Sequence, residues 1–205
     1  MEKLRSLILD CGVAARAQAG ESESGDRHLV KRFRNGALVA AVDGLGHGAD
    51  AARAACMAAA TLERYADESV IPLLQRCHAE LAGTRGAVMS LAKFNWRDRT
   101  VTCLGVGNVE GFLLHSGAGS GPEQEALVLR GGVVGHQLPP LRASVFPVSA
   151  GDTLIFATDG IRSGFTEGLI LSDPASKIAT RILALYTKGT DDALVLVARC
   201  VERAA

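Results

Sequence analysis

Residues 37–48 have the sequence ALVAAVDGLGHG, and this stretch decides how the chain folds. The apolar run over 37–42 predicts a buried strand that stops at Asp43, and the Ala-rich segment 49–66 predicts a helix. Before the run, Asn35-Gly36 is a strong hairpin signal, which places an antiparallel strand over 28–34. A glycine-rich elbow therefore joins a hairpin strand to a helix, with Asp43 at the tip of the strand.

A second helix and a series of strands are predicted after the elbow. Apolar residues at helical spacing indicate that the second helix begins near Ser69, directly after the first. From Thr84 the pattern changes to period two, which is typical of strands. The expected strands form an antiparallel meander that reaches His115, breaks over 116–125, and resumes at 126–129 and 153–158.

The last part of the chain predicts a third helix and a final strand. Asp173 is expected as the helix N-cap, with Pro174 as the first helical residue. The predicted buried face of this helix contains Ile178, Ile182 and Leu185. The apolar run 193–199 then predicts a buried strand. This order of elements favours an antiparallel α+β layer architecture over alternating βαβ units, and we expect one domain over 1–205.

Composition and charge argue against several classes of partner. Lys plus Arg and Asp plus Glu total 22 each, so no net field favours nucleic acid or an anionic membrane. We find neither a signal-peptide pattern nor a segment approaching eighteen uncharged apolar residues. The five cysteines lie far apart without metal-binding spacing, as expected of reduced core thiols. We therefore expect a cytoplasmic protein that binds neither nucleic acid nor membranes.

Acidic residues recur at the tips of apolar strands. Asp43 ends the run over 37–42, Asp159 ends TLIFAT, and Asp191-Asp192 precedes ALVLV. Strand ends can bring distant carboxylates together, and Mg²⁺ and Mn²⁺ prefer such oxygen ligands. Gly44 lets the backbone approach closely and can expose its carbonyl as a further ligand. Although a single Asp-Gly is a common turn dipeptide, the set predicts an oxygen-ligand metal site.

Four segments occur in one order along the chain, namely AAVDGLGHG, GVGNVEGFLL, GDTLIFATDGI and DDALVLV. Together they resemble the PPM, or PP2C-type, family of metal-dependent protein phosphatases, in its compact bacterial branch with sporulation and stress-response members. The resemblance covers nearly the whole chain. It implies an αββα sandwich, in which helices flank two antiparallel sheets and the metals lie at one edge.

The resemblance also implies ligands for two divalent cations, Mn²⁺ or Mg²⁺. Asp43 would bridge the two ions, and the carbonyl of Gly44 would bind one of them. Asp159 and Asp191 would complete the other, because Asp191 rather than Asp192 aligns with the ligand in the family motif. Asp26 would help to hold the second ion directly or through water, and its alternative role is to cap the N-terminal loop.

The reaction that these residues imply is hydrolysis of phosphoserine or phosphothreonine by water that the cations activate. No covalent phosphoenzyme is required, and the sequence contains neither a Cys-x5-Arg loop nor a GxxxxGK[ST] loop. The resemblance suggests phosphorylated STAS-domain scaffold proteins of a stressosome as substrates. The length of a bare catalytic domain favours a monomer.

The chain departs from the family pattern beside the bridging aspartate. Larger members carry a histidine two residues after it, where this chain has Leu45. His47 could donate the proton to the leaving alcohol, or it could simply pack or cap at the start of the helix. Gly25 stands where longer relatives have a second acidic residue.

Other polar residues near the motifs have two interpretations. Three arginines lie near the acidic motifs in sequence, namely Arg130, Arg142 and Arg162. Their side chains could bind phosphate or remain solvated surface charges. The family's Gly-x-Gly-Asn strand is matched by Gly105, Gly107 and Asn108, which we interpret as structural.

Two alternative functions stay open. The glycines at 44, 46 and 48 could form a dinucleotide-binding elbow, but their GxGxG spacing differs from GxGxxG, and a second helix follows where a parallel strand is needed. The chain could also be a catalytically inactive, phosphatase-like module that binds phosphoproteins. Retention of the principal acidic positions favours the enzyme.

Overall fold

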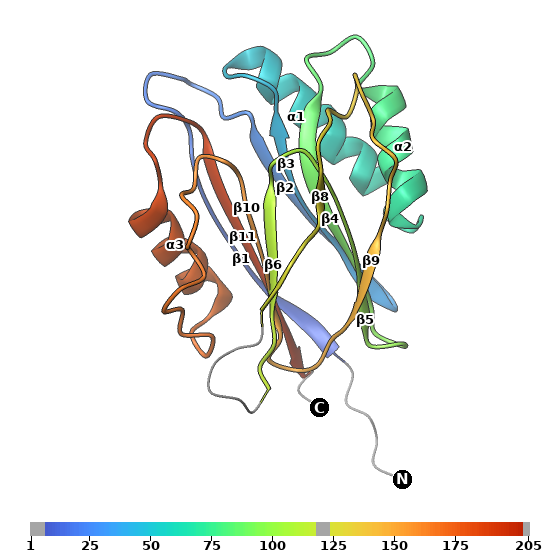
Figure 1. Ribbon diagram of the computed structural model, residues 1–205, viewed down its shortest axis with the longest axis vertical. Coiled ribbons are helices and arrows are strands. Elements are labelled where there is room, and N and C mark those ends of the chain that lie inside the picture. The colour runs from blue at the N-terminus through green and yellow to red at the C-terminus, as the bar shows by residue number, and fades with distance from the viewer. Residues whose placement is uncertain (1–6, 118–123, 203–205) are drawn as a thin grey trace.

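The computed structural model describes residues 7–117 and 124–202. Within these ranges the strands form two sheets that pack face to face, and helices cover their outer faces (Figure 1). This is the αββα sandwich that the resemblance implied. Residues 118–123 of the predicted break lie outside the described part of the chain.

The first sheet contains the predicted hairpin and has the order β2-β3-β4-β5-β8. The turn falls one residue earlier than predicted, at Arg34-Asn35, so Phe33 pairs with Gly36 and Asp26 pairs directly with Asp43. Neighbouring strands run antiparallel except β5 and β8, which pair in parallel, and the unpredicted strand β9 also pairs with β5. The bounds are β2 Asp26–Phe33, β3 Gly36–Gly44, β4 Ala87–Asn95, β5 Thr100–Val106, β8 Leu129–Arg130 and β9 Ser144–Pro147.

The second sheet has the order β1-β11-β10-β6-β7, with the apolar C-terminal strand near its centre. The predicted meander is wrong at β6, which leaves the first sheet and pairs with β10. The chain turns at Gly107, whose φ of +97° favours glycine, and period-two spacing does not reveal which sheet a strand joins. The bounds are β1 Leu7–Arg16, β6 Glu110–Leu114, β7 Gln124–Ala126, β10 Thr153–Ala157 and β11 Ala193–Glu202.

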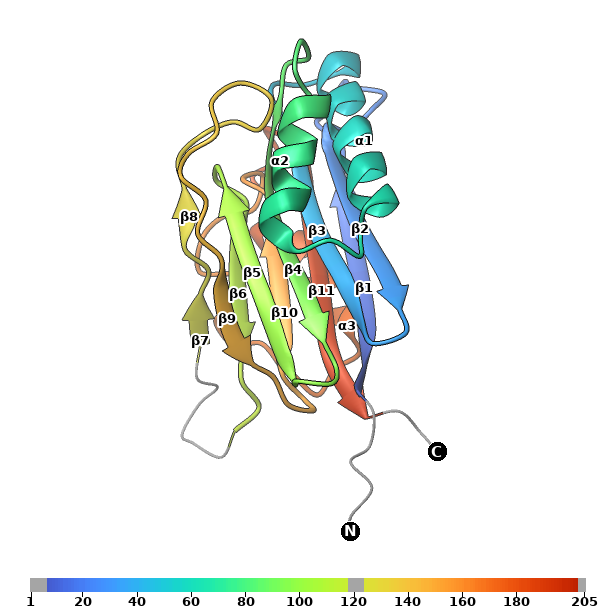
Figure 2. The same ribbon diagram turned by 90° about the vertical axis from the view of Figure 1, so that its right-hand side faces the viewer.

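Helices α1 (Ala49–Arg64) and α2 (Val70–Glu80) cover the first sheet, and α3 (Ala175–Tyr186) covers the second (Figure 2). The alanines of α1 allow a close approach to β3. A Cβ on Gly44 would lie only 2.1 Å from the carbonyl oxygen of Ala51, so glycine is required there. No helix in the described ranges combines the length and the apolar character needed to cross a bilayer.

The predicted cap of α3 is wrong by one residue. Pro174 occupies the N-cap position, and the cap has no hydrogen bond from its own side chain. Asp10 of β1 instead accepts a hydrogen bond from the backbone N–H of Ala175 at 3.1 Å. Asp173 forms an ion pair with Lys177. The first turn of α3 is therefore tied to the sheet that it covers.

Two predictions of burial are also wrong. Leu185 is 57% exposed, because the buried stripe of α3 passes from Ile182 towards the partly buried Tyr186. Cys56 is exposed on α1, where the guanidinium of Arg27 lies 3.2 Å from its sulfur. The cysteines form no disulfide in the described chain, and three of them are buried as predicted, namely Cys77, Cys103 and Cys200.

Candidate active site

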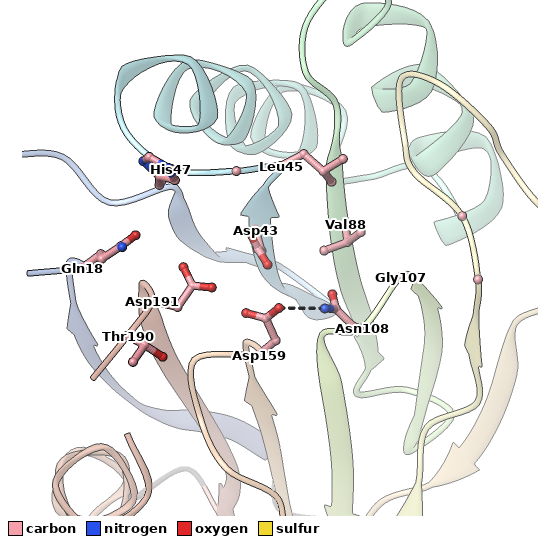
Figure 3. A pocket seen from close by; sticks show the side chains of 13 residues that line it. Gln18, Asp43, Leu45, His47, Val88, Gly107, Asn108, Asp159, Thr190 and Asp191 are labelled. Atoms are coloured by element: carbon pink, nitrogen blue, oxygen red, sulfur yellow. Dashed lines mark hydrogen bonds between the residues drawn. The ribbon is translucent and has the colours of Figure 1, made fainter. Parts of the chain in front are cut away.

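A pocket of about 610 Å³ lies where the ends of β3, β10 and β11 meet. Asp43 is the penultimate residue of β3, Asp159 follows β10, and Asp191 precedes β11. These three side chains line the pocket and lie around its centre in Figure 3. The fold therefore brings together carboxylates that the sequence separates by up to 148 residues, the interval from 43 to 191.

Asp43 has the most strongly perturbed carboxyl group of the pocket. Burial raises its pKa to about 8, and the negative charges of Asp26, Asp159, Asp191 and Asp192 contribute to the increase. Within the described residues, no hydrogen bond or ion pair to its carboxylate compensates for this cost. The site therefore favours either a proton or a cation at Asp43.

Asp26 lies behind the pocket rather than in its lining. The residue is 4% exposed, and its carboxylate accepts a hydrogen bond from the hydroxyl of Thr158 at 2.7 Å. Burial raises its pKa to about 7 despite this bond, and Asp192, Asp159 and Asp191 add to the increase. The hairpin register brings Asp26 beside Asp43, as the expected role of Asp26 requires. One oxygen of the Asp26 carboxylate is already hydrogen-bonded to Thr158.

Asp191 and Asp192 have different surroundings although they are adjacent in sequence. Asp191 lines the pocket, and its carboxylate accepts a bond from the backbone N–H of Asp192 at 2.8 Å. The carboxylate of Asp192 is buried and accepts bonds from the backbone N–H groups of Gln18 at 2.8 Å and Gly25 at 2.6 Å. Asp192 thus fixes the N-terminal loop, which leaves Asp191 available to a ligand.

Asn108 is a site residue that the sequence interpretation treated as structural. Its side-chain amide donates a hydrogen bond to Asp159 at 2.9 Å, drawn as a dashed line in Figure 3. The preceding Gly107 does have a structural role, because a Cβ there would lie 2.2 Å from Val88. The rest of the lining includes Gln18 and Thr190, which lie outside helices and strands and carried no pattern that would identify them.

The arginines near the motifs do not surround the aspartates. The pocket lining contains neither Arg130 nor Arg142. Arg162 instead lines a neighbouring cavity of about 490 Å³ that shares Asn108 and Asp159 with the pocket. One of its terminal nitrogens donates a hydrogen bond to a backbone carbonyl, that of Leu185, at 2.7 Å.

The donor set suits a hydrated hard cation better than a closed metal cage. In residues 7–117 and 124–202, no three His, Cys, Asp or Glu side chains form a group that could hold an ion. Mg²⁺ in particular keeps several waters and is often bound by one or two carboxylates. An open pocket with uncompensated aspartates provides such ligands.

Comparisons with known proteins agree with this architecture. The family model for stage II sporulation protein E (SpoIIE) matches residues 34–201. The phosphoserine phosphatase RsbX of Bacillus subtilis (strain 168) is 28% identical over 178 residues, which are 87% of each chain.

Two solved structures have closely similar folds. A chain from a study of the bacterial stressosome as a modular system controlling secondary messenger signalling is 32% identical, with a TM-score of 0.85, over 94% of this chain and 100% of that one. RsbX in complex with magnesium is 25% identical, with a TM-score of 0.83, over 94% of this chain and 95% of that one. The chain therefore belongs to the SpoIIE family and has the PP2C-type phosphatase fold, as its motifs indicated.

Proposed function

We propose that this chain is a divalent-cation-dependent phosphatase that hydrolyses phosphoserine or phosphothreonine in proteins. The observation that carries the proposal is the pocket formed by Asp43, Asp159 and Asp191, whose mutual repulsion a cation would relieve. Membership of the SpoIIE family and similarity to a phosphoserine phosphatase support a serine/threonine phosphatase. Phosphoryl transfer depends mainly on positioning and charge stabilisation, which such a pocket can provide.

We assign Mg²⁺ or Mn²⁺ to the pocket, as two ions held by Asp43, the carbonyl of Gly44, Asp159 and Asp191, with Asp26 assisting. Similarity to an RsbX that was solved with magnesium supports the choice of a hard cation. When bound, the cations neutralise phosphoryl oxygens and lower the pKa of water. Two of these residues, Asp26 and Gly44, are not in the pocket lining. Both neighbour Asp43, since Asp26 pairs with it from the start of β2 and Gly44 follows it at the end of β3.

Neighbouring groups hold these ligands in place. The amide of Asn108 orients the carboxylate of Asp159, and the hydroxyl of Thr158 orients that of Asp26. Thr158 also accepts a hydrogen bond from the backbone N–H of Leu194 at 2.8 Å, so its hydroxyl has little freedom. Such outer contacts commonly influence metal affinity by one or two orders of magnitude.

The finer assignment is a phosphatase that resets a stress-response complex in the cytoplasm, acting as a single catalytic domain and a monomer. Its proposed partners are phosphorylated STAS-domain scaffold proteins of a stressosome. The similarity to RsbX and to a chain from the stressosome study supports this pathway, and the unpaired cysteines suit a reducing compartment. A purified phosphorylated STAS-domain protein that keeps its phosphate in the presence of the enzyme and Mn²⁺ would contradict the assignment.

The alternative functions have less support. A dinucleotide elbow needs parallel neighbours, whereas β3 pairs antiparallel with both β2 and β4. An inactive phosphoprotein-binding module would not need the aspartates that surround the pocket.

Phosphate release from a phosphoserine peptide, measured with and without Mn²⁺, tests the proposal. We expect hydrolysis that requires the cation and that disappears in Asp43→Asn and Asp159→Asn. Asp152→Asn, which changes a carboxylate remote from the pocket lining, is the matched control and should keep its turnover per folded molecule. Binding of the peptide without hydrolysis, in excess Mn²⁺ or Mg²⁺, would favour the inactive module.

A further inference from the structure

The proposed reaction expels a serine or threonine alkoxide, which is a poor leaving group unless it receives a proton. A side chain at the pocket that carries a transferable proton could supply it. Among the described residues that line the pocket, His47 is the only imidazole. Its location at the rim makes it the first side chain to consider.

His47 is held in one orientation by a residue of the N-terminal loop. Its Nδ1 lies 2.8 Å from Oε1 of Glu21. An ionised carboxylate can only accept hydrogen bonds, so Nδ1 carries the proton of this contact. The other ring nitrogen, Nε2, is therefore left for a second interaction, as in sites where a carboxylate fixes the tautomer of a histidine.

Glu21 also lies beside the start of α1. A Cβ built on Gly48, the N-cap of α1, would lie 3.3 Å from Oε2 of Glu21, so this carboxylate rests against the helix terminus. Negative charge is favoured at that end of a helix because the helix dipole is positive there. The loop that carries Glu21 is anchored at Gln18 and Gly25 by the carboxylate of Asp192. The contacts of Asp192 therefore hold the loop that brings Glu21 to His47, and the nearby helix terminus favours the charge of Glu21.

The pocket places His47 and Asn108 at opposite ends, with the aspartates between them (Figure 3). A phosphoryl group bound over the aspartates would direct its ester oxygen towards one rim or the other. The Asn108 end offers an amide that already donates to Asp159. The His47 end offers a proton that can be transferred.

We propose that His47 is the catalytic acid that protonates the leaving oxygen, and that Glu21 is its positioning residue. This inference rests on the proposed function. As water attacks phosphorus, the bond from phosphorus to the seryl oxygen breaks, and that oxygen takes the proton from Nε2 of the imidazolium. The attacking water loses one proton, and the neutral imidazole regains one from solvent, so the products are the alcohol and hydrogen phosphate.

The test compares substrates that differ in their need for a proton donor. The phenolate of p-nitrophenyl phosphate leaves readily without protonation, whereas the alkoxide of a phosphoserine peptide does not. With Mn²⁺ present, we expect His47→Gln to reduce kcat on the peptide roughly a hundredfold. The reduction on p-nitrophenyl phosphate should be at least about tenfold smaller. The matched control, His28→Gln, changes an exposed histidine of β2 outside the pocket and should affect neither substrate.

The role of Glu21 is tested by two substitutions. Glu21→Ala should reproduce part of the selective loss on the peptide. Glu21→Gln should restore most of the activity, because its amide oxygen can still accept the proton of Nδ1. Nitrogen-15 NMR of the His47 ring should show a protonated Nδ1 in the wild-type protein and a mixture of tautomers in Glu21→Ala.

Three results would overturn the inference. His47→Gln could lower kcat equally on both substrates, it could leave kcat on the peptide unchanged, or the His47 tautomer could be the same in wild-type protein and Glu21→Ala. Failure of the proposed function gives a different result, because the wild-type protein would then hydrolyse neither substrate with Mn²⁺.

Discussion

The two ends of β10 carry aspartates in contrasting situations. Asp152 precedes the strand, is 3% exposed, and accepts hydrogen bonds from the backbone N–H groups of Ser116 and Ser149, each at 2.9 Å. It also contacts Nδ1 of His115 at 3.1 Å. Asp159 follows the same strand, lines the pocket, and accepts a single described hydrogen bond, from Asn108.

The difference shows how the same side chain can serve structure or chemistry. The hydrogen bonds of Asp152 satisfy its charge within the protein and join the segment after β6 to the turn that precedes β10. The charge of Asp159 is largely left to interact with other aspartates and with whatever enters the pocket. The number of internal partners therefore separates a structural carboxylate from one available for a ligand.

The largest expected effect is on catalysis at the pocket end of β10. Asp159→Asn should lower Mn²⁺-dependent hydrolysis roughly 1,000-fold, equivalent to about 4 kcal/mol of activation free energy. Stability without metal should be unchanged or higher, because one negative charge is removed from a group of like charges. Steady-state kinetics and urea unfolding measure the two quantities. If Asp159→Asn keeps its activity, the carboxylate of Asp159 is not needed for catalysis and does not differ from that of Asp152 in this respect.

The next effect is on stability at the other end of the strand. Asp152→Ala should lower the free energy of unfolding by about 3 kcal/mol, because it leaves two backbone N–H groups without their acceptor. Urea denaturation of the metal-free protein measures the change. A loss below about 0.5 kcal/mol would show that water readily replaces the carboxylate.

The pH dependence of stability sharpens the account of Asp43. Its folded-state pKa is raised from 3.8 to about 8, so the folded protein holds a proton that the unfolded chain has released between these values. This contribution to stability is present at low pH and is lost as pH rises through that window. In metal-free protein, Asp43→Asn should flatten the decline by up to about 1.4 kcal/mol per pH unit. Unfolding curves from pH 4 to 9 that are parallel for both proteins would contradict this.

The smallest expected effect separates Asp191 from Asp192. Asp192→Asn should destabilise the metal-free protein by about 1 kcal/mol, because an amide oxygen replaces only one of two accepting oxygens for Gln18 and Gly25. Asp191→Asn should leave that stability nearly unchanged and weaken Mn²⁺ binding instead. Thermal unfolding with and without Mn²⁺ tests both variants, and an exchange of the two phenotypes would reverse our assignment.

The sequence predicted the strand-tip aspartates because each one borders an apolar run, which is a local signal. The pairing of Asp26 with Asp43 does not follow from the predicted turn at Asn35-Gly36, which would place Asp26 opposite Leu45. The observed turn at Arg34-Asn35 gives the different register. The role of Asn108 was missed, because nothing local shows that the strand after Gly107 crosses to the second sheet and meets Asp159. Leu185 was misplaced because helical spacing alone did not distinguish it from Tyr186 as the end of the stripe.

Cation binding by isothermal titration calorimetry tests the central claim most directly. We expect Mn²⁺ to bind the wild-type protein and Asp152→Asn with similar affinity, and to bind Asp43→Asn at least about tenfold more weakly, since metal ligands and their supports commonly influence affinity by this much or more. Equal Mn²⁺ binding by wild-type protein and Asp43→Asn, or no binding by folded wild-type protein, would contradict the assignment of the acidic pocket as a metal centre.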